Sequence, residues 1–144
     1  MIKINYPSYP FKIEQKEGRE HIFDPLRKKW VRLTPEEWVR QNLLQYLLQV
    51  KAYPAALIAV EKEITVGELR KRFDILVYKN SQPWLLIECK EMNTPVEESV
   101  FHQMLRYQSA LQASFMVITN GNETRGWTVK ENEILSLDAL PDYL

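Results

Sequence analysis

The chain has 144 residues, of which 45% are hydrophobic, and this length suits one domain with a sizeable apolar core. It carries 19 Lys and Arg against 19 Asp and Glu. Proteins that grip DNA without help usually have a basic excess, so we do not expect strong autonomous DNA binding. The one cysteine excludes an internal disulfide, and no apolar run is long enough to span a membrane. We therefore expect a reduced, cytoplasmic setting with no membrane partner.

Residues 1–33 are predicted to form a small β-rich extension. Asp24–Arg27 has the composition of a turn, with proline at its second position. The basic run Arg27–Lys29 is interpreted as a solvated turn tip, and His21 has no metal partner at ligand spacing. The strand-like pieces are Lys12–Gln15, Glu20–Phe23 and Trp30–Leu33.

A long amphipathic helix is predicted over residues 34–50. Thr34 suits the N-cap, and Glu37 can reach back to it as a capping box. Projection at 100° per residue places Glu36 near the centre of the apolar face and Glu37 at its edge. Glu36 is thus a charged residue predicted to point toward the apolar core, and Arg40, four residues later, can pair with it. An ordinary surface ion pair remains the alternative.

A first core strand is predicted over residues 55–64, after the Tyr53-Pro54 break. Its Glu61 and Glu63 share one face and are interpreted as edge charges in preference to metal ligands. The best basic patch of the chain follows and leads into the next strand; it could contact a phosphate or simply be solvated. Its residues are Arg70, Lys71 and Arg72.

Two short apolar runs, residues 72–78 and 84–90, are predicted to be paired strands joined by a five-residue loop, residues 79–83. Symmetric pairing sets Tyr78 opposite Trp84. Both faces are apolar, which suits a central pair of strands covered on two sides. Alternation places Asp74, Leu76, Tyr78, Trp84, Leu86, Glu88 and Lys90 on one face, and Phe73, Ile75, Val77, Leu85, Ile87 and Cys89 on the other.

The same pairing sets Asp74 opposite Glu88 where water is scarce. Opposed side chains have Cβ atoms roughly 5 Å apart, and like charges there destabilise a sheet. Two such carboxylates must share a proton, find cations or bind a metal, and Mg²⁺ is commonly held by one or two carboxylates. Lys90 adds a cation on the same face. Simple neutralisation by Lys90 and Arg72 remains open.

A second helix is predicted over residues 94–111, with Thr94 as its N-cap. Gln103 and Tyr107 are four residues apart on a stripe that faces inward, where the Gln amide needs hydrogen-bond partners. Nearby backbone groups could supply them. His102 projects elsewhere and is interpreted as a surface residue.

The passage from Trp84 to Thr119 reads as strand, helix, strand, which predicts parallel pairing with a right-handed crossover. We expect an α/β fold: a mixed sheet of four or five core strands flanked by two main helices. In the acidic tail, Leu135, Leu137 and Leu140 are expected to pack back. The predicted single domain comprises the extension 1–33, a core 34–130 with further strands at 114–119 and 126–130, and a tail 131–144.

Asp74 followed by Glu88-Cys89-Lys90 resembles the PD-(D/E)xK nuclease motif, with Phe73 in place of the proline before the Asp. Gln103-Met-Leu-Arg-Tyr107 resembles the QxxxY element found on the next helix in some branches. The run from Thr34 to Gly121 is similar to the N-terminal nuclease-like domain of the type I restriction enzyme motor (R) subunit.

This resemblance implies a restriction-endonuclease-like core and Mg²⁺-dependent phosphodiester hydrolysis of DNA, with Mn²⁺ as a substitute. It implies that Asp74, Glu88 and the Cys89 backbone carbonyl hold the metal, and it favours Glu36 over Glu37 as the acid that completes the cluster. Lys90 would orient a water or stabilise the transition state, and Gln103 and Tyr107 would position these parts.

Two alternatives remain open. The chain could be a catalytically weak or inactive module that binds DNA or a partner protein, or an α/β domain whose hairpin charges are merely paired. No GxxxxGK[ST] motif occurs. We therefore expect that any motor or sequence specificity comes from a protein partner.

Overall fold

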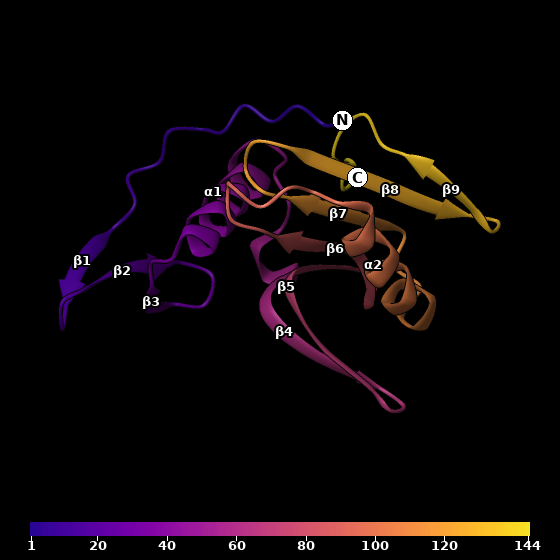
Figure 1. The fold of residues 1–144 in the computed structure, drawn as a ribbon, viewed down its shortest axis with the longest axis horizontal. Coiled ribbons are helices and arrows are strands. Elements are labelled where there is room, and N and C mark those ends of the chain that lie inside the picture. The colour runs from indigo at the N-terminus through magenta and orange to yellow at the C-terminus, as the bar shows by residue number, and fades with distance from the viewer.

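The computed structural model describes residues 1–144, which form two β-sheets, two α-helices and one short 3₁₀ helix. Figure 1 shows a small sheet at one end of the molecule, α1 beside it, and the large sheet beyond. The elements are β1 (Ile13–Lys16), β2 (Arg19–Asp24), β3 (Lys29–Arg32), α1 (Pro35–Gln49), η1 (Ala55–Leu57), β4 (Ile58–Val66), β5 (Leu69–Lys79), β6 (Gln82–Cys89), α2 (Glu98–Leu111), β7 (Phe115–Thr119), β8 (Thr124–Lys130) and β9 (Glu133–Ser136).

The large sheet has the strand order β4-β5-β6-β7-β8-β9. Strands β6 and β7 are parallel and are joined through α2, and every other neighbouring pair is antiparallel. The predicted mixed α/β fold is therefore confirmed, with β5 and β6 in the interior of the sheet. The sheet has six strands where four or five were expected, because part of the tail pairs with β8 as β9.

The two faces of the large sheet carry separate apolar cores, one under each helix. Both cores draw on β5, β6 and β7, which explains why these strands are apolar on both sides. The core on the α1 face includes Leu43, Leu44, Leu47, Ile75, Val77, Leu85, Ile87, Cys89 and Val117. The core on the α2 face comprises Phe73, Leu76, Leu86, Val96, Met104, Ala113, Met116 and Ile118.

The β5–β6 connection is tighter than predicted. Lys79 pairs with Gln82, so only Asn80 and Ser81 form the turn, both with positive φ (53° and 63°) as in a type I′ hairpin. The register then shifts between Val77 and Tyr78, and Tyr78 lies opposite Pro83, not opposite Trp84. The extra residue, Trp84, packs into the α1-side core, so its predicted face was also wrong.

Both helices form, but their predicted N-terminal contacts are only partly correct. Thr34 caps α1 by accepting a hydrogen bond from the Glu37 N–H at 3.0 Å. The Glu37 side chain, however, binds arginines instead of completing a capping box. Helix α2 begins at Glu98, four residues after the predicted cap, because Thr94 belongs to a turn and hydrogen-bonds to Glu91.

A buried polar network fixes the small sheet to α1. The fully buried Asp24 side chain accepts hydrogen bonds from the backbone N–H of Leu26 and Arg27, from Arg27 Nε and from Gln41 Nε2. Arg27 also donates to Glu37 at 2.9 Å. Arg27 is therefore not part of a solvated turn tip, as predicted; only Lys28 and Lys29 are exposed.

The two ends of the chain lie close together on one side of the molecule (Figure 1). The Ile2 N–H donates to the Thr124 carbonyl, and Ile2 is buried against the α1-side core. In the tail, Leu140 is buried as predicted, whereas Leu135 in β9 is 48% exposed because it lies on an edge strand. Neither helix is long and apolar enough to cross a membrane.

The Asp24 network predicts an acid-sensitive attachment of the small sheet. Burial by itself would raise the pKa of Asp24, but the hydrogen bonds from Arg27 and Gln41 outweigh it and lower the pKa. Stability from Asp24 is then present above its unfolded pKa and is lost as the pH falls through the lower folded pKa. We expect Asp24→Asn to lower the free energy of unfolding by about 2–4 kcal/mol at pH 7.

Urea denaturation from pH 7 down to pH 2 measures this effect, and the difference between wild type and Asp24→Asn should shrink below about pH 4. The matched control is Asp138→Asn, an exposed acid that makes no hydrogen bond or ion pair. A constant difference at all pH values would show that the loss comes from packing.

Candidate active site

The predicted acidic site lies where the pairing between β4 and β5 is irregular. Their ladder pairs Val60 with Ile75 and Lys62 with Phe73 but skips Glu61 and Asp74. Glu61 has a positive φ of 56°, an uncommon conformation for a non-glycine residue. Such departures from regular pairing re-aim side chains, and here the departure falls at the proposed metal ligand.

Asp74 uses its carboxylate to bridge β6 and α1. Its Oδ2 accepts a hydrogen bond from the Cys89 backbone N–H at 2.8 Å, and its Oδ1 accepts one from Arg40 Nη1 at 2.8 Å. The ladder between β5 and β6 ends with the pair Ile75 and Ile87. The Asp74 side chain therefore binds the Cys89 N–H just beyond the ladder's last residue pair.

Glu88 lies beside Asp74 and is also buried, with 7% of its surface exposed. Burial, together with the adjacent Asp74 carboxyl, raises the pKa of Glu88 to about 8. Lys71 Nζ lies 3.4 Å from Glu88 Oε1 and opposes that shift. The oxygen Oε1 has no hydrogen-bond partner although it is buried. The structure thus brings the two acids together in a place that water reaches poorly.

The alternation of side chains breaks at Asp74. Ile75 lies in the α1-side core as predicted, but Phe73 packs in the α2-side core with its ring edge-on to Tyr107. The prediction that Phe73 shares a face with Ile75 was therefore wrong. The cause is the skipped position in the β4–β5 ladder, which strict alternation does not anticipate.

Arg40 is the central cation of the site. It donates to Glu37, Glu61 and Asp74, and only 8% of its side chain is exposed. Burial alone would lower the pKa of Arg40, but its bonds to these carboxylates, first of all Glu37, raise it. The guanidinium therefore stays charged and links α1 to both β4 and β5. The predicted pairing of Arg40 with Glu36 was wrong.

The predicted burial of the two helix glutamates was reversed. Glu37 is buried and its carboxylate is held by Arg27, Arg40 and Gln41, so it has a structural role. Glu36 is exposed, although helical projection predicted that it points inward. The projection failed because the small sheet covers the side of α1 that carries Glu37. Partial desolvation and the nearby Asp74 nevertheless raise the pKa of Glu36.

A cavity of about 30 Å³ lies next to Glu88, between β5, β6 and α2. This volume accommodates a water molecule. Gln103 lies at the outer side of the cavity and is exposed. The predicted need for buried hydrogen-bond partners of its amide therefore does not arise. Lys71 also lies above the rings of Phe73 and Tyr107, 5.9 and 5.6 Å from their centroids. The cavity is lined by Lys71, Glu88, Lys90, Val100, Gln103, Met104 and Tyr107.

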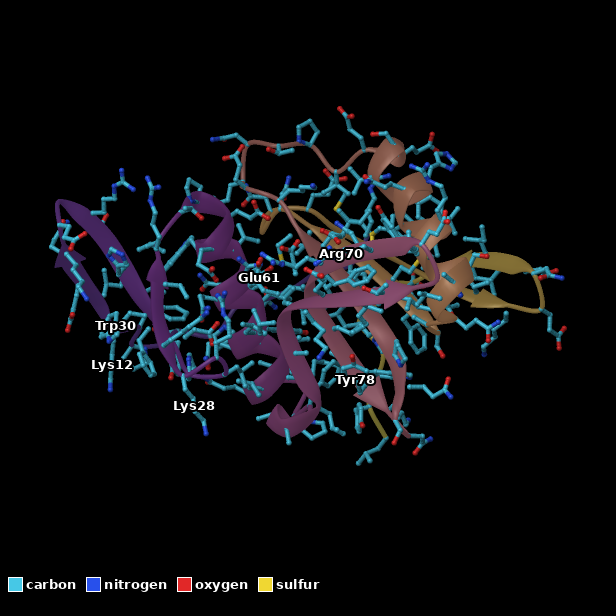
Figure 2. The ribbon with its side chains drawn as sticks, turned by 90° about the horizontal axis from the view of Figure 1, so that it is seen from below. Lys12, Lys28, Trp30, Glu61, Arg70 and Tyr78 are labelled. Atoms are coloured by element: carbon cyan, nitrogen blue, oxygen red, sulfur yellow. The ribbon has the colours of Figure 1, made fainter.

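The other predicted substrate contacts line the projecting β4–β5 hairpin. Arg70 pairs with Glu63, and Arg72 lies 3.7 Å from both Glu61 and Glu63. The side chains of Arg70 and Arg72 remain 74% and 61% exposed. Figure 2 shows Glu61 on the α1 side of the hairpin and Arg70 farther from α1.

The donor set of the site fits a hard divalent cation. Asp74 and Glu88 supply carboxylate oxygens, of which the buried Glu88 Oε1 accepts no hydrogen bond. The N–H and C=O of one residue in an extended strand point to the same side, so the Cys89 carbonyl points toward β5, as its N–H does. No group of three His, Cys, Asp or Glu side chains is clustered for a metal. Two carboxylates, a carbonyl and waters are the usual environment for Mg²⁺.

Three site contacts were missed by the sequence reasoning: Arg40 with Asp74, Arg40 with Glu61, and Lys71 with Glu88. The signal for Arg40 was present, since an arginine on an apolar helix face requires a buried acid. Its choice of acid depends on how α1 docks on the sheet. Lys71 was predicted only as part of a basic patch, whereas it lies beside the ring of Phe73, which packs in the α2-side core.

The fold and the site define a class of protein. A mixed sheet that carries an Asp on one central strand and Glu-x-Lys at the end of the next is the restriction-endonuclease-like arrangement. In agreement, the structure resembles a crystal structure from Anabaena variabilis ATCC 29413, whose description proposes a nuclease belonging to DUF820. The TM-score is 0.52 at 11% sequence identity, covering 87% of this chain and 80% of that one.

Residues 35–141 match the family model described as the type I restriction enzyme R protein N terminus. The chain therefore belongs to that family, which confirms the resemblance seen in the sequence. No curated protein matches the chain significantly.

The raised pKa of Glu88 predicts that this residue weakens the fold at alkaline pH when no divalent cation is present. A carboxyl whose folded pKa is raised costs stability as the pH rises from its unfolded pKa through the folded value of about 8. In EDTA at pH 9 we expect Glu88→Gln to raise the Tm by about 3–6 °C.

Thermal unfolding at pH 5 and pH 9 measures this difference, which should be small at pH 5. The control is Glu68→Gln, because Glu68 is an exposed acid in the β4–β5 turn that forms no ion pair. A lower Tm for Glu88→Gln at pH 9 would mean that Lys71 fully compensates the buried charge.

Proposed function

We propose that the chain is a Mg²⁺-dependent deoxyribonuclease that hydrolyses DNA phosphodiester bonds at the Asp74–Glu88 pair. The observation that carries this proposal is the buried Glu88 Oε1, which accepts no hydrogen bond, has only the Lys71 ammonium at 3.4 Å and lies beside a second carboxylate. Buried polar atoms without a hydrogen bond are rare in folded proteins, and a bound cation would resolve this one. Membership of the restriction-enzyme family supports DNA as the substrate.

The residues of the site have complementary roles in this proposal. Asp74, Glu88 and the Cys89 carbonyl would hold the cation, with Glu36 as a further acid at the exposed side. The bound cation would polarise the scissile phosphate and lower the pKa of a coordinated water. Arg40 keeps Asp74 in place through its 2.8 Å hydrogen bond.

The cavity beside Glu88 would provide the rest of the machinery. The Lys90 ammonium would orient the attacking water or place positive charge where the transition state becomes more negative. Gln103 would contact the water or a phosphate oxygen, and Tyr107 would support Lys71, which lies 5.6 Å from its ring centroid. The exposed Arg70 and Arg72 would contact the DNA backbone along the hairpin.

A second function is favoured by one specific observation. Arg40 Nη1 already binds both Asp74 and Glu61, so an internal cation balances part of the acidic cluster without a metal. This arrangement suits a nuclease-like module that binds DNA or a partner protein and cleaves weakly or not at all. In either case the partner would supply the motor or the sequence specificity.

Plasmid nicking tests the catalytic proposal. With Mg²⁺, wild type should convert supercoiled plasmid to nicked circles, and Asp74→Ala and Lys90→Ala should each lower the rate about 10²–10³-fold, because each removes charge stabilisation at the reacting phosphate. Lys62→Ala, an exposed lysine on neighbouring β4, is the matched control. Equal nicking by wild type and both site variants would favour the binding module.

Calorimetric titration with Mn²⁺ tests the metal site without requiring activity. Wild type should bind Mn²⁺, and Asp74→Asn should bind it at least about tenfold more weakly, because a neutral amide replaces a charged ligand. Arg40→Lys distinguishes the two functions further. Tighter Mn²⁺ binding by that variant would indicate that Arg40 competes with the metal, as the binding-module proposal requires.

A further inference from the structure

The small β1-β2-β3 sheet has one face turned toward α1 and one turned to solvent. Ile22 and Asp24 of β2 are fully buried, and Asp24 contacts Gln41 of α1, so their face is the inner one. Side chains alternate along a strand, which places Phe23 on the opposite face. Pairing extends this face to β1 and β3, since Phe23 lies opposite Trp30 and its N–H donates to the Lys12 carbonyl. The residues of this outer face are Lys12, Glu14, Lys16, Arg19, His21, Phe23, Trp30 and Arg32.

The outer face is strongly positive in a chain whose net charge is zero. It carries four cations and one acid, Glu14, and none of the four cations belongs to an ion pair. These side chains are exposed. At the other end of the chain, residues 131–144 hold four acids and no Lys or Arg. A polyanion would therefore be attracted to the small sheet and repelled from the tail.

Aromatic rings lie among these cations. The rings of Phe23 and Trp30 pack edge to face with centroids 5.5 Å apart, and Lys12 Nζ lies 5.8 Å from the Phe23 centroid. Trp30 is 37% exposed, which is high for so large an apolar side chain. Figure 2 shows Lys12 and Trp30 on the same side of the sheet, with Lys28 of the adjoining turn nearby.

We propose that the outer face of the β1-β2-β3 sheet binds a single-stranded nucleic-acid segment, with Trp30 stacking on a base and the surrounding cations contacting its phosphates. Exposed aromatic rings combined with cations are the pattern by which proteins hold single strands. A duplex offers the same phosphates but hides the faces of its bases, so it would not engage Trp30. This inference is separate from the proposed cleavage, because no outer-face residue belongs to the acidic site.

The small sheet is attached directly to the helix that carries part of the acidic site. Strand β3 ends at Arg32, and α1, which carries the site residue Arg40, begins at Pro35. The buried network of Asp24, Arg27 and Glu37 fixes the sheet to α1. A strand bound on the outer face would therefore be held at a fixed position relative to the acidic site.

Fluorescence anisotropy with a labelled dT20 oligonucleotide in EDTA tests the proposal, because no cleavage occurs there. Trp30→Ala should weaken binding about 5- to 100-fold, and Trp30→Tyr, which keeps a stacking ring, should bind within about threefold of wild type. The double variant Lys12→Gln/Arg32→Gln should reduce the slope of log K against log salt by about 1.4, or 0.7 for each lost phosphate contact. A labelled 20-base-pair duplex should bind more weakly than dT20.

Lys130→Glu, at the far end of β8, is the matched control and should leave the affinity for dT20 within about twofold of wild type. Circular dichroism and Tm confirm that each variant keeps its fold. Unchanged affinity in both Trp30→Ala and the double variant would overturn the proposal, as would duplex binding equal to that of dT20 and insensitive to Trp30→Ala. If the wild-type protein binds dT20 as expected but does not nick plasmid in Mg²⁺, the result would count against the cleavage proposal alone.

Discussion

The juxtaposition of the Asp74 and Glu88 carboxyls in a poorly hydrated place is the constraint on which the rest of the site depends. Two buried like charges repel each other strongly, and the surrounding structure offsets this only in part. Arg40 and the Cys89 N–H hold Asp74, whereas Glu88 has Lys71 alone, at 3.4 Å. The imbalance leaves Glu88 Oε1 without a hydrogen bond, and a small divalent cation has the charge and ligand preference to bind such an oxygen.

The large sheet supports this arrangement through its two separate cores. Because α1 and α2 cover opposite faces, the part of β5 from Phe73 to Val77 and most of β6 are shielded from water on both sides. At the skipped position of Glu61 and Asp74, the Asp74 carboxylate belongs to neither core and instead binds Arg40 and the Cys89 N–H. Charge is also divided between regions of the molecule, since the small sheet carries free cations and the tail carries acids. A net charge of zero therefore does not describe what a nucleic acid would meet at any one surface.

Much of the fold could be predicted from local sequence patterns. The Thr34 cap, the apolar face of α1 and the crossover through α2 follow from periodicity and capping, which depend on neighbouring residues. The start of α2 and the bulge at Trp84 could not be predicted in this way. Thr94 is as good a cap as Thr34, but it bonds to Glu91 in a turn. Trp84 leaves strict alternation because the Asn80–Ser81 turn and the register of Ile75 with Ile87 differ by one residue.

The sequence by itself determined which residues form the acidic site: strand spacing placed Asp74 opposite Glu88, and helical spacing placed Gln103 and Tyr107 beside each other. Only the tertiary structure decided which basic side chain forms an ion pair with which acid. Arg40 could reach Glu36 or Glu37 within its own helix, yet it also binds Glu61 and Asp74 because α1 docks against β4 and β5. Strand and helix periodicities are fixed by backbone geometry within a few residues. Long charged side chains instead choose among partners that only the packing of distant elements brings within reach.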